Sequence, residues 1–304
     1  MNYLVLGASG FIGKHLTRTL LESGQRVTAF DIKHADEFES GRIKFVEGKF
    51  SPDYPFDNLV RGHDVIFHLI STTLPSTNQS LTQEITDNVF STLSLLEACV
   101  KENVKRIVFI SSGGTVYGKS NRRPFKESAV TNPIASYGIQ KLMIEKYLNL
   151  YKHKFNLDFR VVRLANPYGP GQNPNGAVGA VTVFMDRALS GKEISIFGDG
   201  SSVRDYIYIS DAIQGIINIA HSENNEEVYN LGSGIGTSLN DILEQIYLLN
   251  GKKVDVNYFP QRDSDLDYSV LDIKRYQNEF PSHQMLSLSE GMKKLYTVMK
   301  EENK

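Results

Sequence analysis

At the start of the chain the apolar residues follow two patterns in turn, first that of a buried strand and then that of a helix. The run Asn2–Leu6 is continuous and aliphatic, as in a buried strand of a parallel sheet. From residue 11 to residue 21, the apolar residues recur at helical spacing instead. Residues 26–30 are again rich in β-branched and apolar side chains and predict a second strand. The chain therefore starts as strand, helix and strand.

The same alternation continues through the first half of the chain. Further strands are predicted at 43–47, 64–70, 106–111 and 158–164, and helices at 81–101 and 134–154. Strands that alternate with helices favour a parallel sheet covered on both faces. We therefore expect an α/β fold with a doubly wound parallel Rossmann sheet, whose ligands bind at the carboxyl ends of the strands.

The composition changes after residue 165. Residues 166–176 are dense in Asn, Pro and Gly, which form turns. We expect a Rossmann domain at 1–165 and a smaller C-terminal substrate-binding lobe at 166–304, with residues 203–222 returning to the large domain.

Charge and cysteine content narrow the classes of function. The 304 residues carry a formal net charge of −2, which indicates neither a nucleic-acid surface nor an anionic-membrane surface. The one cysteine, Cys99, falls on a predicted amphipathic helix and is expected in the core, so no intrachain disulfide can form. No stretch approaches the ~18 apolar residues of a membrane span, and no signal-peptide pattern is seen. We expect a cytoplasmic enzyme.

The histidines give no indication of a metal site. All seven are scattered without the spacing of metal ligands. His68 lies at the end of an apolar run, where we expect a hydrogen-bonded histidine and not a ligand.

A glycine-rich turn joins the first strand to the first helix. Its sequence is Gly7-Ala8-Ser9-Gly10-Phe11-Ile12-Gly13, with the spacing G-x-x-G-x-x-G. Glycines allow a tight turn and a close approach of pyrophosphate to the helix N-terminus, where amides and the helix dipole favour anions. Its place between strand and helix identifies it as a dinucleotide-binding turn. We expect Gly7, Gly10, Phe11, Ile12 and Gly13 to bind the cofactor.

The second predicted strand ends in Asp31, which bears on the choice of cofactor. An acidic residue roughly twenty positions past the glycines can accept the ribose hydroxyls of the adenosine half, and it would repel a 2′-phosphate. We therefore expect NAD. Lys33, two positions further on, keeps NADP as the alternative.

Tyr137 and Lys141 are spaced to lie on one face of a helix. A free tyrosine is a poor base at neutral pH, because its pKa is about 10. A neighbouring ammonium, together with a positively charged nicotinamide ring, stabilises the phenolate and lowers that pKa. The pair follows a predicted strand that ends in Ser111-Ser112-Gly113-Gly114-Thr115, which should bring hydroxyl groups to the cleft. These residues indicate hydride transfer with Tyr137 as the base and Lys141 as its partner.

Taken in order, the motifs resemble those of the extended short-chain dehydrogenase/reductases, and most of all the NAD-dependent nucleotide-sugar epimerases typified by UDP-glucose 4-epimerase. The resemblance spans nearly the whole chain. It comprises the glycine turn, Asp31, Asn88, the stretch 111–118, Tyr137 with Lys141, and the segments 166–169, 196–200, 203–209 and 229–234, followed by Arg262 and Asp265.

The resemblance implies a reaction and a set of ligands. Tyr137 would deprotonate the sugar 4-hydroxyl while C4 passes a hydride to NAD, and the 4-keto sugar would then take the hydride back on its other face. Asn88 would contact the cofactor. The implied nucleotide-sugar ligands are Asn166, Arg204 and Arg262 for the diphosphate, Asp265 for the uridine ribose, and the segment around Phe197 for the base.

The chain departs from the family pattern at the third catalytic position. Relatives usually carry Ser or Thr two positions before Thr115, where this chain has Gly113. Either Thr115 or Ser112 could supply the missing hydroxyl that bridges tyrosine and sugar. Our expectation is Thr115.

Other activities share the fold and the cofactor. Dehydratases carry an Asp-Glu pair where this chain has Gly114 and Thr115, and decarboxylases typically carry Glu at the Thr115 position, so both activities are disfavoured. A 4-reductase or 4-dehydrogenase of nucleotide sugars remains an alternative, as does an NAD-binding protein without catalysis.

Two further expectations come from the resemblance. Ser269 matches a position at which a bulky tyrosine restricts relatives to plain hexoses, so a serine should also admit 2-acetamido sugars. Relatives form homodimers through their two long helices, which correspond here to residues 81–101 and 134–154.

Overall fold

The computed structural model describes residues 1–304 except 35–42, 74–79, 120–121, 177–178, 263–265 and 303–304. The chain divides into two compact units. The first comprises Met1–Ser112, Ala135–Arg163 and Ile216–Tyr229; the second comprises Gly113–Ile134, Leu164–Gly215 and Asn230–Lys304. The predicted boundary at residue 165 stays a prediction.

The first unit is built on a seven-stranded sheet with the strand order β10-β6-β5-β4-β1-β2-β3. Its strands are β1 (Asn2–Leu6), β2 (Arg26–Asp31), β3 (Lys44–Glu47), β4 (Val65–His68), β5 (Arg106–Ser112), β6 (Asp158–Leu164) and β10 (Val228–Leu231). The pairs from β5 through β4, β1 and β2 to β3 are parallel. The order reverses direction beside β1, as in a Rossmann sheet, which confirms the predicted α/β fold.

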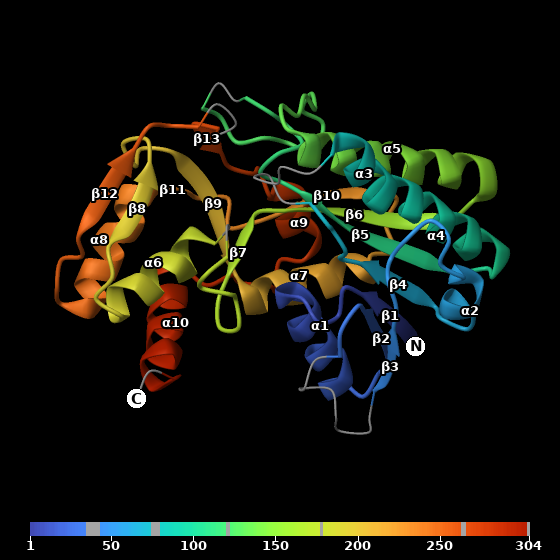
Figure 1. The fold of residues 1–304 in the computed structure, drawn as a ribbon. Coiled ribbons are helices and arrows are strands. Elements are labelled where there is room, and N and C mark those ends of the chain that lie inside the picture. The colour runs from blue at the N-terminus through green and yellow to red at the C-terminus, as the bar shows by residue number, and fades with distance from the viewer. Residues whose placement is uncertain (35–42, 74–79, 120–121, 177–178, 263–265, 303–304) are drawn as a thin grey trace. The chain divides into compact units, whose positions relative to one another are not determined.

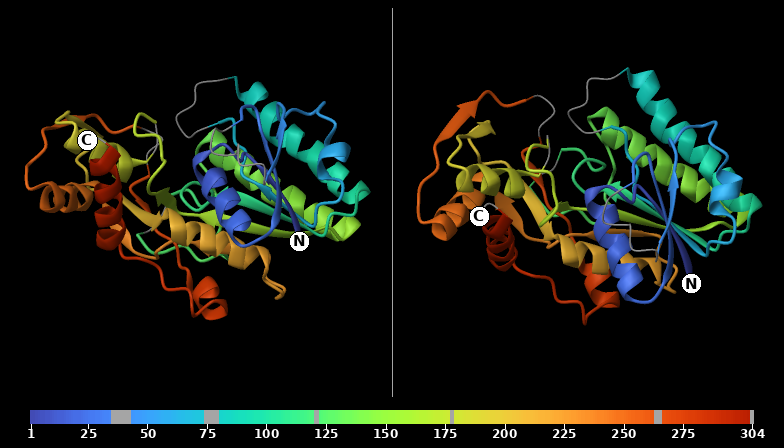
Figure 2. Two further views of the ribbon diagram at one scale, coloured as in Figure 1. Left: turned by 90° about the horizontal axis from the view of Figure 1, so that it is seen from below. Right: turned by 60° about the horizontal axis from the view of Figure 1, so that its bottom comes forward.

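Helices cover both faces of this sheet. They are α1 (Phe11–Glu22), α2 (Phe56–Val60), α3 (Leu81–Ile85), the π-helical turn η2 (Thr86–Phe90), α4 (Ser91–Lys101) and α5 (Ser136–Phe155), together with the part of α7 (Ile209–Ala220) that begins at Ile216. Figures 1 and 2 show α4 beside α5 on one face and α1 on the opposite face. The helix predicted at 81–101 is thus interrupted by a π-helical turn.

The core of this unit lies between the sheet and the α4–α5 face. Fully buried strand residues such as Ile66 and Phe109 pack with Leu96 of α4 and Ile144 of α5. Cys99 is buried in the same cluster with its thiol free, which confirms its prediction as a core residue. The continuous apolar runs became strands because both faces of the sheet are covered.

The second unit contains shorter strands and four of the described helices. The strands are β7 (Asn166–Tyr168), β8 (Ile194–Phe197), β9 (Val203–Tyr208), β11 (Gly236–Ser238), β12 (Val256–Phe259) and β13 (Tyr268–Ser269). The helices are α6 (Ala180–Leu189), α8 (Leu239–Asn250), α9 (Lys274–Glu279) and α10 (Leu288–Glu302). Strand β9 is central, because it pairs with β7, β11 and β13.

A buried carboxylate holds the loops around β9. Asp205 accepts hydrogen bonds from the backbone N–H groups of Ser233, Gly234 and Leu271, at 2.8, 3.1 and 3.3 Å. Burial raises the pKa of Asp205 to about 6, although these hydrogen bonds oppose the rise. These hydrogen bonds fix the backbone beside Arg204, the residue that directly precedes Asp205 on β9. A separate finding concerns membranes: within the part of the chain that the structure describes, none of the helices has the length and apolar composition of a membrane span.

Candidate active site

The turn between β1 and α1 and the first turn of α1 each contain a position that requires glycine. Gly7 has φ +85°, in the left-handed region. A Cβ on Gly13 would lie 2.0 Å from the Gly7 carbonyl oxygen, so a side chain there would collide with the turn. The Gly7 N–H donates to the carbonyl of Phe30 at 2.9 Å, which ties the turn to the end of β2.

The first turn of α1 faces this loop with free hydrogen-bond donors. Gly10 is the N-cap and makes no side-chain cap, so the amides of Phe11 and Ile12 have no intrahelical acceptors. Such a helix start favours an anion. The tight glycine contacts and this helix start fit the pyrophosphate of a dinucleotide, as the sequence predicts.

Asp31 ends β2 beside the same turn. Its Oδ2 accepts the Ser9 N–H at 2.9 Å and its Oδ1 accepts the Ile32 N–H at 2.7 Å. Each carboxylate oxygen can accept a further hydrogen bond. The side chain is therefore positioned by the glycine turn and still able to accept ribose hydroxyls.

Tyr137 and Lys141 lie in the first turns of α5. The Lys141 Nζ lies 5.7 Å from the centroid of the Tyr137 ring and donates to the Ile110 carbonyl at 2.9 Å. Burial lowers the pKa of Lys141 to about 7, and the Glu145 carboxylate opposes this shift. Burial raises the pKa of Tyr137 to about 12. Both residues are thus pushed toward their uncharged forms in the free chain.

Ser112, and not Thr115, is the hydroxyl with a contact to Tyr137. A hydrogen bond with the Ser112 side chain lowers the pKa of Tyr137, against the effect of burial. Thr115 belongs to the second unit, where its Oγ1 is buried without a hydrogen-bond partner. The sequence-based preference for Thr115 stays a prediction, but the observed contact favours Ser112.

Asn88 lies on the π-helical turn η2 and is already heavily hydrogen-bonded. Its Nδ2 donates to Thr73 Oγ1 at 2.6 Å and to Gln140 Oε1 at 2.8 Å, and its Oδ1 accepts the Thr72 N–H at 2.9 Å. Gln140 in turn donates to the buried Glu84 carboxylate at 2.9 Å. Asn88 therefore links the segment after β4 to α5, and a cofactor contact from it stays a prediction.

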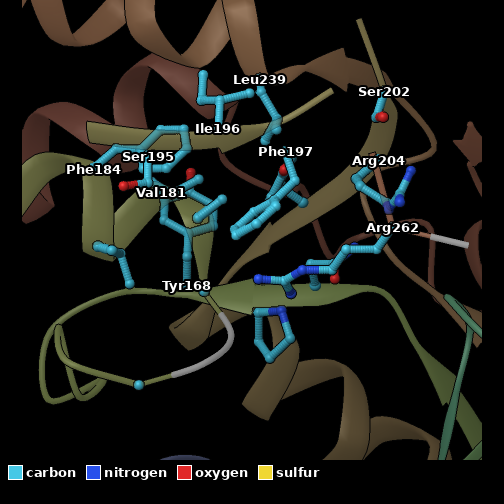
Figure 3. A pocket seen from close by; sticks show the side chains of 17 residues that line it. Tyr168, Val181, Phe184, Ser195, Ile196, Phe197, Ser202, Arg204, Leu239 and Arg262 are labelled. Carbon is cyan, nitrogen blue, oxygen red and sulfur yellow. The ribbon is translucent and has the colours of Figure 1, made fainter. Parts of the chain in front are cut away.

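The second unit contains a pocket of about 340 Å³ that gathers most of the predicted nucleotide-sugar ligands (Figure 3). Its lining includes Asn166, Tyr168, Phe197, Arg204, Tyr206 and Arg262. Figure 3 shows Arg262 extending beneath the ring of Phe197, and its guanidinium carbon lies 3.6 Å from the ring centroid. Two arginines in one pocket suit phosphate oxygens.

Backbone contacts hold the polar residues of this pocket. Asn166 Nδ2 donates to the Asp205 carbonyl at 2.8 Å, and Arg204 Nη1 donates to the Val203 carbonyl at 2.9 Å. Burial raises the pKa of Tyr206 to about 12, so its hydroxyl stays protonated as a donor. Sequence reasoning missed Tyr206, although it follows Arg204 by two positions on the same strand.

Two further predicted ligands are Asp265 and Ser269. Asp265 is outside the described residues. Ser269 is buried on β13, and its Oγ donates to the Gly113 carbonyl at 3.3 Å. The serine thus lies against the glycine that replaces the usual hydroxyl-bearing residue.

The imidazole ring of His68 has a hydrogen-bond partner at one of its two nitrogens. His68 is buried at the end of β4, and its Nε2 lies 2.9 Å from Thr92 Oγ1, while its Nδ1 has no partner. Burial lowers the pKa of His68 to about 3, so the ring is uncharged at neutral pH. The ring is therefore hydrogen-bonded, as expected, but at one of its two nitrogens. The described residues contain no cluster of metal-ligating side chains.

Comparison with known proteins gives relatives over the whole length. A solved UDP-glucose 4-epimerase with UDP-glucose from Thermotoga maritima is 32% identical, with a TM-score of 0.93 and 100% of both chains covered. A UDP-glucose 4-epimerase of Mycolicibacterium smegmatis is 31% identical over 97% of each chain. A dTDP-4-dehydro-6-deoxyglucose reductase of Escherichia coli is 30% identical over 96% of this chain and 95% of its own.

The family assignment agrees with the motifs on which it was predicted. The profile of the NAD dependent epimerase/dehydratase family matches residues 3–232, which include the glycine turn, Asp31, Tyr137 and Lys141. With this match and relatives at 30% identity or more over nearly the full length, the chain belongs to the NAD-dependent epimerase/dehydratase family.

Proposed function

We propose that the protein is an NAD-dependent epimerase that inverts C4 of a UDP-sugar through a transient 4-keto intermediate. The observation that carries this proposal is the buried Tyr137–Lys141 pair with Ser112 hydrogen-bonded to the tyrosine, in the unit that holds the dinucleotide turn. The positions used by dehydratases for an extra acid and base hold Gly114 and Thr115, so the site is equipped for oxidation and reduction at one carbon.

The first unit would hold the cofactor. The glycine turn and the amides of Phe11 and Ile12 would bind the pyrophosphate, and Asp31 would accept the adenosine ribose hydroxyls. When bound, NAD accepts a hydride from C4 of the sugar and can return it. The carboxylate of Asp31 disfavours a 2′-phosphate, which supports NAD over NADP.

Tyr137 would take and return the proton of the 4-hydroxyl. In the free chain its phenol is protonated, because burial raises its pKa to about 12. The Lys141 ammonium and the Ser112 hydroxyl both stabilise the phenolate, so together they bring the base closer to its working range. Lys141 would also hold the ribose of the nicotinamide half.

The second unit would hold the nucleotide. Arg204 and Arg262 would bind the diphosphate with Asn166, and Phe197 would line the base site. Asp265 is proposed as the uridine-ribose ligand on the resemblance alone. A firm hold on the diphosphate and a loose hold on the sugar would let the keto sugar present either face.

A 4-reductase of nucleotide sugars is the second candidate, because one relative of similar identity is a dTDP-4-dehydro-6-deoxyglucose reductase. The two functions differ in their use of the cofactor. An epimerase regenerates its NAD in each turnover, whereas a reductase consumes a reduced nicotinamide in each turnover.

The test is to incubate the purified protein with separate nucleotide sugars and no added cofactor, and to follow inversion at C4 by NMR. We expect UDP-hexoses to reach an equilibrium of C4 epimers. The epimerase proposal fails if no substrate inverts and a 4-keto sugar is instead reduced with stoichiometric loss of NADH or NADPH. Heat-denatured protein is the control.

We propose that 2-acetamido sugars are also accepted, because the serine at position 269 is much smaller than the tyrosine that the resemblance associates with plain hexoses. The comparison is the parent protein against Ser269→Tyr on UDP-glucose and UDP-GlcNAc. Selective loss of the UDP-GlcNAc activity supports the proposal. Equal loss on both substrates, or no loss on either, rejects it.

We further propose a cytoplasmic homodimer. The lone cysteine is buried and unpaired, which suits a reducing compartment. The helices proposed for the interface carry exposed apolar side chains, at Leu81, Phe90, Ile139 and Leu150. Exposed apolar side chains on neighbouring helices suit a two-fold contact between copies.

A further inference from the structure

A buried ion pair lies one helical turn beyond Lys141. Glu145 of α5 pairs with Arg163 of β6, with 2.7 Å between Arg163 Nη2 and Glu145 Oε2, and both side chains are about nine-tenths buried or more. Arg163 Nε donates to Glu145 Oε1 at 3.1 Å, and Ser111 Oγ donates to the same oxygen at 2.5 Å. The sequence analysis assigns no role to Glu145 or Arg163, and it includes Ser111 only in the hydroxyl-bearing stretch 111–115.

Such a pair is weak evidence of stabilisation. The cost of removing both charges from water is comparable to their mutual attraction, so a buried Arg–Glu pair often adds little to the free energy of unfolding. Its position is more informative. Residues four apart on a helix are neighbours, so the Glu145 carboxylate lies next to the Lys141 side chain.

Burial opposes a positive charge on Lys141, whereas an aromatic ring face and a carbonyl oxygen beside its ammonium favour one. Its ammonium lies against the ring of Phe109, at 4.7 Å from the centroid, and its side chain is 5% exposed. From β4 it faces His68, which is uncharged at neutral pH because burial lowers its pKa to about 3. From α5 it faces the phenol of Tyr137, and from β5 the Ile110 carbonyl. Glu145 supplies a negative charge that favours the ammonium, and Arg163 offsets the charge of Glu145.

The same carboxylate also fixes the end of β5. Ser111, which donates to Glu145, directly precedes Ser112, and Ser112 is hydrogen-bonded to Tyr137. The contact therefore holds the strand end that carries one hydroxyl against the helix that carries the base.

We infer that Glu145 is a positioning residue that acts with Arg163 to set the charge of Lys141, and that acts through Ser111 to hold Ser112 against Tyr137. The inference rests on the proposed function. It predicts that the pKa of Lys141 shifts in opposite directions when Glu145 or Arg163 is replaced. Loss of the carboxylate disfavours the ammonium, whereas loss of the guanidinium leaves the carboxylate unneutralised and favours the ammonium.

The experiment measures the alkaline limb of the pH profile of kcat for the purified protein with its bound cofactor. Glu145→Gln should move the limb down by about one pH unit, and Arg163→Gln should move it up by a similar amount, as expected for a nearby charge. The double variant, with both charges removed, should return the limb to the parent position. Glu227→Gln, which breaks the more exposed pair with Lys152 of the same helix, is the control and should move nothing.

A second measurement reads Lys141 without using activity. The 13Cε resonance of labelled lysine, assigned with Lys141→Arg, should titrate lower in Glu145→Gln and higher in Arg163→Gln. Glu145→Asp keeps the charge and should restore the titration of the parent. Ser111→Ala keeps both charges, so it should lower kcat without moving the limb.

The pair would be merely structural if the alkaline limb moved in the same direction in both single variants. The same conclusion would follow if the limb stayed in place and only the melting temperatures fell. If a single variant does not fold, Glu145→Asp and the double variant decide, because a limb displaced in either one contradicts the inference. Failure of the proposed function is distinguishable, since the parent would then invert no nucleotide sugar while the lysine titration could still be measured.

Discussion

Tyr137 and Lys141 show how burial acts on a catalytic pair. The same desolvation raises the pKa of the tyrosine to about 12 and lowers that of the lysine to about 7. Each change disfavours the charged form that the proposed chemistry needs. The phenolate and the ammonium must therefore stabilise each other, with help from Ser112 and Glu145.

Replacing Tyr137 by Phe removes the ionisable oxygen and leaves the ring. We expect kcat to fall by about 10²–10⁴-fold, the range typical of general acid–base groups, with bound NAD retained. The matched control is Tyr147→Phe, the same change ten positions further along the same helix. Turnover of Tyr137→Phe within a few-fold of the parent would mean that the base lies elsewhere.

The hydroxyl that replaces the one missing at Gly113 can be identified by a pair of variants. Because Ser112 is hydrogen-bonded to Tyr137, we expect Ser112→Ala to lower kcat by about tenfold or more, equivalent to ~1.4 kcal/mol in the transition state. Thr115→Val should have the smaller effect. The reverse ranking in steady-state kinetics would return the role to Thr115, as the sequence predicts.

The chemistry of single residues could be predicted from the sequence, but not their surroundings. Spacing places Tyr137 and Lys141 on one face of a helix, and order along the chain identifies the arginines of the pocket. Nothing in the sequence pairs Glu145 with Arg163, because the two meet only when α5 packs beside β6. The hydroxyl partner of Tyr137 likewise depends on how the end of β5 turns.

At the scale of elements, the strand–turn–helix at the N-terminus depends on close backbone contact. Gly13→Ala would place a methyl group 2.0 Å from the Gly7 carbonyl oxygen. Overpacking of this kind costs about 1–3 kcal/mol, and the displaced turn should also lose its grip on the pyrophosphate. We expect a lower melting temperature and loss of NAD from the purified protein.

Gly24→Ala is the control for this variant. Gly24 follows α1 with φ +76° and has no atoms near the added methyl group, so it reports only the cost of the backbone conformation. It should keep the NAD content of the parent. Equal NAD content in both variants would contradict the assigned role of the turn.

Regular elements were predictable where the hydrophobic period is clear. The strands of the parallel sheet read as continuous apolar runs, and the long helix α5 was predicted almost to its ends. The helix predicted at 81–101 contains a π-helical turn, and Asn88 on this turn is buried and bonds to Gln140 and to the segment after β4. A local pattern carries no information about such distant partners.

At the scale of the whole molecule, the exposed apolar side chains of α3, η2 and α5 predict self-association. We expect sedimentation at micromolar concentration to show a homodimer, with Phe90→Glu and Ile139→Glu shifted toward monomer because a buried charge is costly. Val130→Glu, at an exposed apolar position of the second unit, is the control and should stay dimeric. A parent protein that is monomeric at these concentrations would remove the dimer proposal.

In the proposed reaction a hydride leaves C4 of the sugar and returns to the same carbon on its other face. The most direct test supplies UDP-glucose with deuterium at C4, no added cofactor, and detection by NMR and mass spectrometry. We expect a C4-inverted product that keeps its deuterium, with no net oxidation or reduction. Inversion with loss of deuterium to water, or conversion only when a reduced nicotinamide is added, would contradict it.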